Sequence, residues 1–278
     1  MRVAVVTDST AYLPTALAAQ HQVTVVPLHV VLGSRTGAEN VDIAPAEVAC
    51  ALGERRVAVS TSRPTPEEFA EAYRASGASQ VVSLHLSSAL SGTVDSARLG
   101  AAQVLADGIE VWVVDTKSIV MGLGFAVLDA AAAALAGADL KAVEAAGAAA
   151  ATTTLFYVDS LEHLRRGGRM TARAALVGAA LAVKPLLHVV DGEIALLEKV
   201  RTASKGLARL EQVAAERAGT GPVELAVHHL AAAVAAEQLS DRLRARIPGL
   251  QRLHLSEVGA VVGAHVGPGL LGVVVLRR

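Results

Sequence analysis

Cysteine is nearly absent from this chain of 278 residues. Cys50 is the only one, which excludes an intramolecular disulfide framework and a CxxC metal site. We expect it to lie in a helix as a small, buried apolar side chain, the commonest environment of a free cysteine. Aromatic residues are also scarce, at 3% of the chain, so any binding cavity is expected to be aliphatic.

The sequence has no excess of charge of either sign. It holds 25 Lys and Arg residues against 26 Asp and Glu residues, for a net charge of −1. A surface that binds nucleic acid needs a strongly basic patch to neutralise the phosphates. The composition therefore argues against nucleic acid as a partner.

Long uninterrupted apolar segments are missing too. The most lipid-like stretch, "SIVMGLGFAVLDAAAAALAG" at 118–137, contains Asp129 and three glycines. A membrane-spanning helix needs about 20 strongly apolar residues, so this stretch predicts a buried helix instead. The first residues, "MRVAVVTDST", have the pattern of a strand rather than that of a signal peptide. We expect a cytoplasmic protein.

The common nucleotide and metal motifs do not occur. The sequence has no GxxxxGK[ST] segment, and no GxGxxG segment opens a helix after the first strand. Its nine histidines show neither HxxxH nor HExxH spacing. We therefore expect no ATP or NAD site, no metal ion and no cofactor.

The first half of the chain alternates between strand and helix patterns. Short continuous apolar runs, typical of buried parallel strands, occur at 3–7, 23–32, 55–62, 81–86 and 110–115. This alternation predicts a parallel sheet with helices on both of its faces.

Two helix starts in this half are well marked. Thr65, Pro66 and Glu68 have the spacing of an N-cap, a proline at the first helical position and a capping box. Asp139 precedes an alanine-rich run and is expected to cap a second helix.

The second half follows a different pattern. Asp191 and Gly192 separate two strand-like runs, which predicts a β-hairpin. Further strands are expected at 223–229, 251–255 and 270–276, with helices between them. The predicted fold class is thus a two-domain α/β protein. Residues 1–155 form a Rossmann-like domain with a parallel sheet, and residues 156–278 form an α+β domain with a mixed sheet.

Hydroxyl-rich segments follow three of the predicted strands. They are "DST" at 8–10, "TS" at 61–62 and "SSALSGT" at 87–93. Ligands of open α/β sheets bind at the carboxyl ends of strands, and the N-termini of helices attract anions. Gly92 allows a ligand to approach the backbone closely. The pattern favours a cradle for a carboxylate or a phosphate, with ordinary helix capping by Ser and Thr as the alternative.

The segment "GAHVGPG" at 263–269 is the second unusual stretch. Its three glycines and one proline predict a rigid loop that carries a single histidine, His265. Such a histidine either donates a hydrogen bond to an anion or is solvated in a turn between two strands. Composition alone does not decide between the two.

Eight segments occur in an order that is typical of one family. They are "TDSTAYLP" (7–14), "TSRPTPEEF" (61–69), "LSGTVDSA" (90–97), "LRRGGR" (164–169), "KP" (184–185), "DGEI" (191–194), "KVRT" (199–202) and "GAHVGPGLLG" (263–272). Together they resemble the DegV family of bacterial fatty-acid-binding proteins. The resemblance extends from the first predicted strand to the last.

The resemblance implies a long-chain fatty acid in an apolar pocket between two α/β domains. It places the carboxylate on hydroxyls and one histidine, with neighbouring residues in support. By position in this sequence these are Thr61, Ser91 and His265, supported by Ser62, Gly92 and Thr93.

The resemblance also implies that the protein is not itself an enzyme. Relatives present the acid to a separate fatty acid kinase, and the acyl phosphate enters phospholipid synthesis, which is compatible with transient contact with a membrane surface. Arg169 and Arg201 match basic positions of the family and are expected to contact the kinase or the nascent phosphate. A solvated or ion-paired arginine is the alternative at both positions.

Two other functions stay open at this point. The first is a stand-alone acyl or phosphoryl transferase with Ser91 as its nucleophile and His265 as its base, although the sequence has no GxSxG elbow. The second is a protein that binds a small polar anion and has no lipid tunnel.

Overall fold

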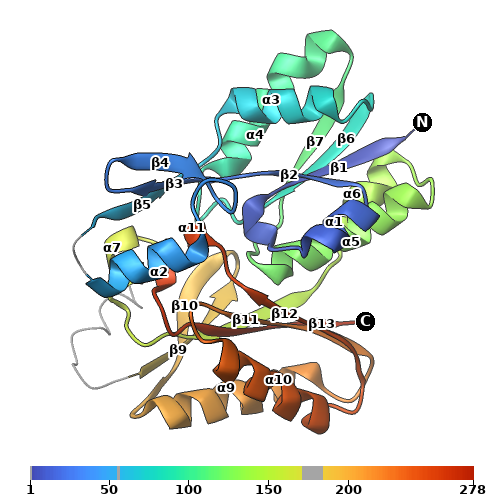
Figure 1. Cartoon of the computed structure of the whole chain (residues 1–278). Helices are drawn as coiled ribbons and strands as arrows, with labels where there is room; N and C mark the ends of the chain where they lie inside the picture. Colours follow the sequence, from blue (N-terminus) through green and yellow to red (C-terminus); the bar gives the residue numbers. More distant parts are fainter. Residues whose placement is uncertain (1, 55–56, 171–183) are drawn as a thin grey trace. The chain divides into compact units, whose positions relative to one another are not determined.

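The computed structural model describes residues 2–54, 57–170 and 184–278 (Figure 1). Its contacts divide the chain into two compact units. Unit 1 comprises Met1–His29 and Ser62–Ala150, and unit 2 comprises Val30–Thr61 and Ala151–Arg278. The predicted two-domain α/β class is confirmed. The chain enters unit 2 twice, however, so a single boundary after residue 155 does not describe the division.

Unit 1 is built on a parallel four-stranded sheet in the order β2-β1-β6-β7. All six residues of β1 are buried, as expected for a strand whose two faces are both covered. The elements of this unit are β1 (Val3–Asp8), η1 (Ser9–Ala11), α1 (Thr15–Gln20), β2 (Val23–Val26), α3 (Pro66–Ala75), β6 (Gln80–His85), α4 (Thr93–Val104), η2 (Leu105–Asp107), β7 (Glu110–Asp115), α5 (Met121–Leu135) and α6 (Leu140–Ala148).

Helices cover both faces of this sheet (Figure 1). On one face, Phe69 of α3 and Ala97 of α4 belong to the same buried cluster as Val6 and Val81 of the sheet. On the other face, α5 and α6 contact β1 and β6, and Gly147 of α6 lies against the Leu84 side chain. The predicted parallel sheet with helices on both faces is confirmed.

The marked helix starts are also confirmed. Thr65 accepts the Glu68 N–H at 3.3 Å, and the Glu68 carboxylate accepts the Thr65 N–H at 2.7 Å, which is a complete capping box. Asp139 accepts the Ala142 N–H at 2.8 Å and caps α6. Among the helices that the structure describes, none is long and apolar enough to cross a membrane.

The segment before β5 differs from the prediction. The apolar run at 23–32 splits at Pro27 into β2 of unit 1 and β3 (His29–Leu32), since proline cannot donate to a sheet. With β4 (Arg35–Ala38) and β5 (Val59–Ser62), β3 forms a small sheet in the order β4-β3-β5. The alternation predicts that the run at 55–62 belongs to the parallel sheet. This prediction is wrong, because β5 belongs to the small sheet instead.

Packing within unit 2 explains where this segment belongs. Its helix α2 (Pro45–Glu54) packs against α11 (Ala260–Val266), and Gly263 of α11 lies near Val48. The buried carboxylate of Glu39 accepts the Val261 N–H at 2.7 Å, near the start of α11. Cys50 lies in α2 as predicted, but it is exposed rather than buried.

Unit 2 is otherwise a mixed six-stranded sheet in the order β10-β9-β8-β13-β11-β12. Among the described strand pairs of this sheet only β11 and β12 are parallel, joined through α10, and the Asp191–Gly192 turn connects the predicted hairpin β9–β10. The remaining elements of this unit are β8 (Thr152–Tyr157), α7 (Glu162–Gly167), β9 (Lys184–Val190), β10 (Glu193–Val200), α9 (Ala203–Ala218), β11 (Val223–His229), α10 (Ala233–Arg246), β12 (Leu250–Glu257) and β13 (Leu271–Arg277).

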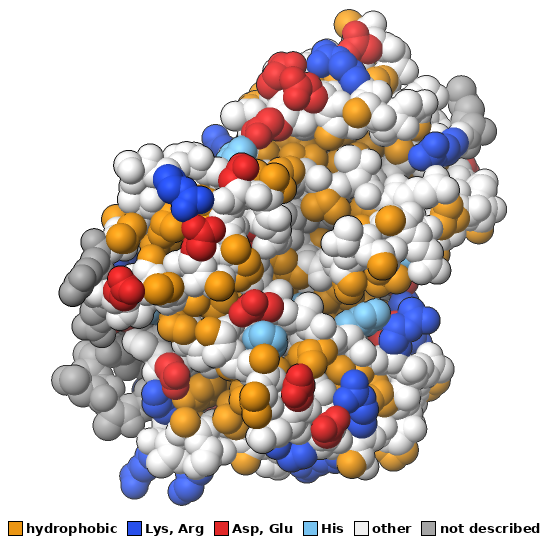
Figure 2. All heavy atoms as spheres, in the orientation of Figure 1, with side chains coloured by type: hydrophobic (Ala, Val, Ile, Leu, Met, Phe, Trp, Pro, Cys, Tyr) orange, Lys and Arg blue, Asp and Glu red, His pale blue; other side chains and the backbone are white. Residues whose placement is uncertain are grey.

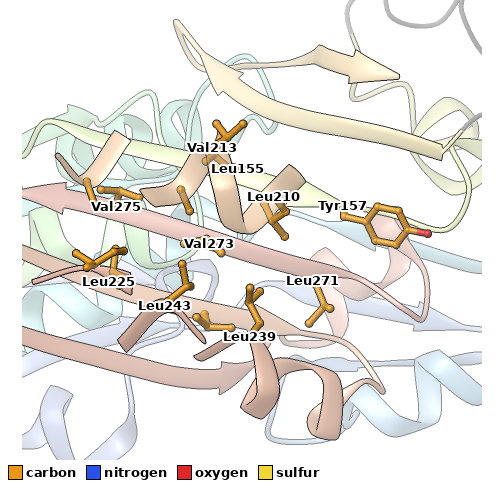
Figure 3. Packing of buried hydrophobic residues seen from close by; sticks show 14 of the residues in the cluster. Leu155, Tyr157, Leu210, Val213, Leu225, Leu239, Leu243, Leu271, Val273 and Val275 are labelled. Atoms are coloured by element: carbon orange, nitrogen blue, oxygen red, sulfur yellow. The ribbon is translucent and has the colours of Figure 1, made fainter. Parts of the chain in front are cut away.

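One buried cluster joins the helices and the sheet of unit 2 (Figure 3). Leu210 of α9 and Leu239 and Leu243 of α10 lie among side chains of the strands, such as Leu155 and Val273. The outer face in Figure 2 shows Lys and Arg side chains interspersed with Asp and Glu among its described residues. That distribution agrees with the near-zero net charge.

Candidate functional site

The connection between β6 and α4 carries the hydroxyl-rich segment of unit 1, and we call residues 87–93 the hydroxyl loop. Thr93 begins α4 and Gly92 is its N-cap, without a hydrogen bond from a capping side chain. The Ser91 Oγ and Thr93 Oγ1 atoms lie 2.9 Å apart in a hydrogen bond. Thr93 is fully buried and Ser91 is half-buried. The loop therefore presents one partly accessible hydroxyl at the positive end of a helix.

Other hydroxyls near this edge are used within the fold. Ser88 Oγ donates to Asp115 at 2.5 Å, and Ser87 Oγ accepts the Ala89 N–H at 3.2 Å. Ser9 Oγ accepts the Leu28 N–H, and Thr10 Oγ1 donates to Asp8. For these four hydroxyls, local capping and bridging is the better interpretation.

Arg63 is a charged neighbour of the hydroxyl loop that the sequence analysis missed. Its guanidinium fills the space where a side chain at position 92 would project. Gly92 has a φ of −73°, which any residue adopts, so a larger residue here would displace the Arg63 guanidinium rather than strain the backbone. The sequence offered one indication of this residue, because Arg63 is the arginine of the segment "TSRPT". Its charge adds to that of the α4 N-terminus beside Ser91 and Thr93.

In unit 2 the fold joins two predicted site residues that are 204 positions apart. Thr61 lies near the end of β5, and its Oγ1 is 2.8 Å from Nε2 of His265. His265 lies in the last turn of α11 rather than in a loop. The loop begins after it, where Gly267 and Gly269 have φ values of 77° and 86°. The interpretation of His265 as a solvated turn residue is thus wrong, because its ring is hydrogen-bonded and mostly enclosed.

The surroundings of His265 keep its ring uncharged. Burial, together with the nearby positive charge of Arg169, lowers the pKa of His265 to about 4. The imidazole is therefore neutral at pH 7 and offers one donor and one acceptor. Gly167 packs directly against its Nδ1, where any larger residue would displace the ring.

A cavity of about 330 Å³ within unit 2 opens beside this pair. Its polar lining comes from Ser60 and Thr61 of β5, from His265 and from three basic residues near α7: His163, Arg166 and Arg169. Arg166 is paired with Glu162 at 2.5 Å, and Arg169 donates to the Gly167 carbonyl. Of these three, only Arg169 was predicted as a site residue; His163 and Arg166 were not, although "LRRGGR" contains Arg166. The cavity can accept an anionic group beside a hydroxyl and a neutral imidazole.

The remaining predicted residues divide as follows. Arg201 is exposed in the turn between β10 and α9 and does not line this cavity. Ser62, Ser91, Gly92 and Thr93 belong to unit 1, while Thr61 and His265 belong to unit 2. The convergence of both groups on one carboxylate therefore stays a prediction. Within the described ranges, no group of three or more His, Cys, Asp or Glu side chains could hold a metal ion.

Comparisons with known proteins agree over the whole chain. A family model described as an uncharacterised protein of the DegV family matches residues 2–278. A DegV domain-containing protein of Streptomyces coelicolor is 58% identical, with 99% of each chain covered. Protein DegV of Bacillus subtilis is 35% identical, with 98% of each chain covered.

Solved structures give the same result. A DegV family protein from Thermus thermophilus, described by its fatty acid binding, has a TM-score of 0.91 and 32% identity, with both chains fully covered. The structure of DegV from Bacillus subtilis, described as a fatty acid binding protein, also has a TM-score of 0.91, at 33% identity and full coverage of both chains.

Proposed function

Because this chain belongs to the DegV family, we propose that it binds a long-chain fatty acid and holds the carboxylate with hydroxyl groups and His265. The observation that carries the proposal is the hydrogen bond between Thr61 and His265 at a cavity with basic neighbours. The two similar structures described as fatty-acid-binding support the choice of ligand.

The head of the ligand needs few contacts in this arrangement. Ser91 and Thr61 offer neutral hydroxyls, the buried Thr93 supports Ser91 through the hydrogen bond between them, and the start of α4 offers backbone N–H groups. In this proposal, Ser62 and Gly92 support these groups from the adjoining backbone. Neutral donors fix the direction of the carboxylate and leave one of its oxygens open.

The tail supplies most of the affinity. Burial of an alkyl chain contributes roughly 0.8 kcal/mol per CH₂, or on the order of 12 kcal/mol for about 16 carbons. The loss of freedom on binding offsets part of this gain. With 3% aromatic residues in the chain, the wall around the tail is expected to be aliphatic.

The open carboxylate oxygen suggests a role as a carrier. We infer that the protein presents the acid to a separate fatty acid kinase in the cytoplasm and that the resulting acyl phosphate enters phospholipid synthesis. The sequence has no P-loop motif, so the kinase would supply the nucleotide. In this proposal Arg169, which lines the cavity, and the exposed Arg201 contact the kinase or the nascent phosphate, and the protein touches the membrane surface transiently.

A Ser91→Ala variant separates a carrier from a transferase. A carrier loses one of several hydrogen bonds to an ionised carboxylate, so we expect palmitate affinity to fall about tenfold to a hundredfold while kinase-dependent acyl phosphate formation persists. A transferase with Ser91 as its nucleophile would lose nearly all turnover. The measurements are palmitate titration of the delipidated protein and acyl phosphate formation with the kinase and ATP. Ser88→Ala is the matched control, because that hydroxyl is bonded to Asp115.

A further inference from the structure

A chain of buried polar side chains lies beneath the hydroxyl loop in unit 1. It runs from Asp8 at the end of β1 through His85 and Ser83 of β6 to Tyr73 of α3. Each of these four residues is 0% exposed, so none of them can touch a ligand. Polar groups buried to this extent destabilise a fold unless they are hydrogen-bonded, and here every one is.

Asp8 is the anchor of this chain. Its Oδ1 accepts the N–H of Thr10 at 3.0 Å and the Thr10 hydroxyl at 2.5 Å. Its Oδ2 accepts the N–H of Leu86 at 3.0 Å and faces His85 Nδ1 at 3.0 Å. The same carboxylate oxygen is thus shared between the Leu86 backbone and the His85 ring. His85 thereby fixes the carboxylate in the orientation that holds Leu86.

The other end of the chain reaches α4. His85 Nε2 lies 2.7 Å from Ser83 Oγ, and Ser83 Oγ lies 3.0 Å from the Tyr73 hydroxyl. The Tyr73 hydroxyl also donates to the Ala97 carbonyl of α4 at 3.3 Å. Burial raises the pKa of Tyr73, so this hydroxyl stays protonated and remains a donor.

These contacts hold the backbone on both sides of the hydroxyl loop. Leu86 immediately precedes Ser87, and Ala97 lies in the second turn of the helix that Thr93 begins. Asp8, His85 and Ser83 are hydrogen-bonded to one another in the same order as the Asp, His and Ser residues of a catalytic triad. Ser83 is fully buried, however, and bonded on both sides, so its hydroxyl cannot attack a substrate.

We propose that the Asp8–His85–Ser83–Tyr73 chain is a positioning device that fixes the hydroxyl loop, and with it Ser91, for the carboxylate of the ligand, with His85 as its central positioning residue. The inference rests on the proposed fatty acid binding. A shift of the loop by a fraction of an ångström misaligns the head contacts, whereas contacts to the tail do not depend on the loop hydroxyls. Loss of the chain is therefore expected to affect head recognition selectively.

The test compares palmitate with 1-hexadecanol, which has the same tail length but no carboxylate. Tyr73→Phe removes one oxygen and cuts the link to α4. His85→Asn keeps a donor near Nδ1 but breaks the link to Ser83. We expect each variant to bind palmitate about threefold to tenfold more weakly and hexadecanol within twofold of the wild type. Val104→Ala, in the same buried cluster but outside the chain, is the control and leaves both affinities unchanged.

The possible outcomes separate this inference from the function on which it rests. Parallel losses for both ligands, or no loss for either, would overturn the positioning role while leaving fatty acid binding intact. A wild-type protein that binds neither ligand would overturn the proposed function itself. If His85→Asn fails to fold, Tyr73→Phe decides the question alone, because it removes a single atom from an otherwise unchanged ring.

Discussion

Replacement of His265 by alanine is expected to weaken palmitate binding about tenfold to a hundredfold. In the proposed complex the neutral imidazole donates to an ionised carboxylate, and hydrogen bonds to charged groups contribute about 1.5–3 kcal/mol. The substitution also leaves the Thr61 hydroxyl, now bonded to the ring at 2.8 Å, without that partner. Titration of the delipidated variant and wild type with palmitate measures the difference.

Two controls make this result specific. His188→Ala removes a histidine of unit 2 that does not line the cavity, and it is expected to leave palmitate affinity unchanged. Binding of 1-hexadecanol to His265→Ala is expected to fall by less than threefold, since an alcohol carries no charge to recognise. Equal losses for the acid and the alcohol would show that His265 supports the pocket rather than the carboxylate.

Mild acid is expected to destabilise unit 2 through a second histidine, His228. This residue is 1% exposed, and burial lowers its pKa from the ordinary 6.5 to about 3. His228 therefore takes up a proton below about pH 6.5 in the unfolded chain, but only below about pH 3 in the native state. Stability is therefore full above pH 6.5 and falls as the pH falls, by about 2 kcal/mol at about pH 5 from this residue alone. His265, with its pKa lowered to about 4, acts in the same direction.

Urea unfolding at about pH 7.5 and about pH 5 measures this effect. His228→Gln cannot titrate in this range, so its loss between the two pH values should be smaller than that of the wild type by about 2 kcal/mol. Ser240→Ala is the control: it removes a buried hydroxyl of the same unit and should lower stability equally at both pH values. An unchanged pH dependence in His228→Gln would contradict the assignment.

The parts of the fold that follow from local rules were predictable. The capping box of Thr65 and Glu68, the cap at Asp139 and the Asp191–Gly192 hairpin each depend on a few adjacent residues. The continuous apolar runs at β1, β6 and β7 identified a sheet that is covered on both faces. In each case the chemistry that forms the element is contained in a short window of sequence.

The predictions that were wrong concern segments whose structure depends on contacts with residues far away in the sequence. Segment 30–61 belongs with unit 2 because α2 packs on α11 and Glu39 bonds to a residue 222 positions away. The glycines of "GAHVGPG" suggested a loop. Gly263 instead lies inside α11, where a residue without a side chain fits closely against Leu230. Local composition cannot distinguish a glycine that bends the chain from one that permits close packing.

The candidate site was predictable mainly through family resemblance. Thr61 and His265 were paired on that basis, and the structure joins them within unit 2. The residues that analysis missed, such as Arg63 and His163, are ordinary surface types whose position is set by folding. Conversely, Asp8 was predicted to be part of a ligand cradle, but it is fully buried. The prediction was wrong because a hydroxyl-rich strand end has the same sequence pattern whether it is buried or lines a ligand site.

If this protein carries a long-chain fatty acid, the lipid should copurify with it. The protein is purified without added lipid, weighed by native mass spectrometry, then denatured and extracted with organic solvent for lipid analysis. We expect a stoichiometric fatty acid of 14–18 carbons, whose tail burial contributes roughly 10–14 kcal/mol before ordering losses. An empty extract, and no mass increase after incubation with palmitate or oleate, would contradict it and leave the cavity to a small polar anion.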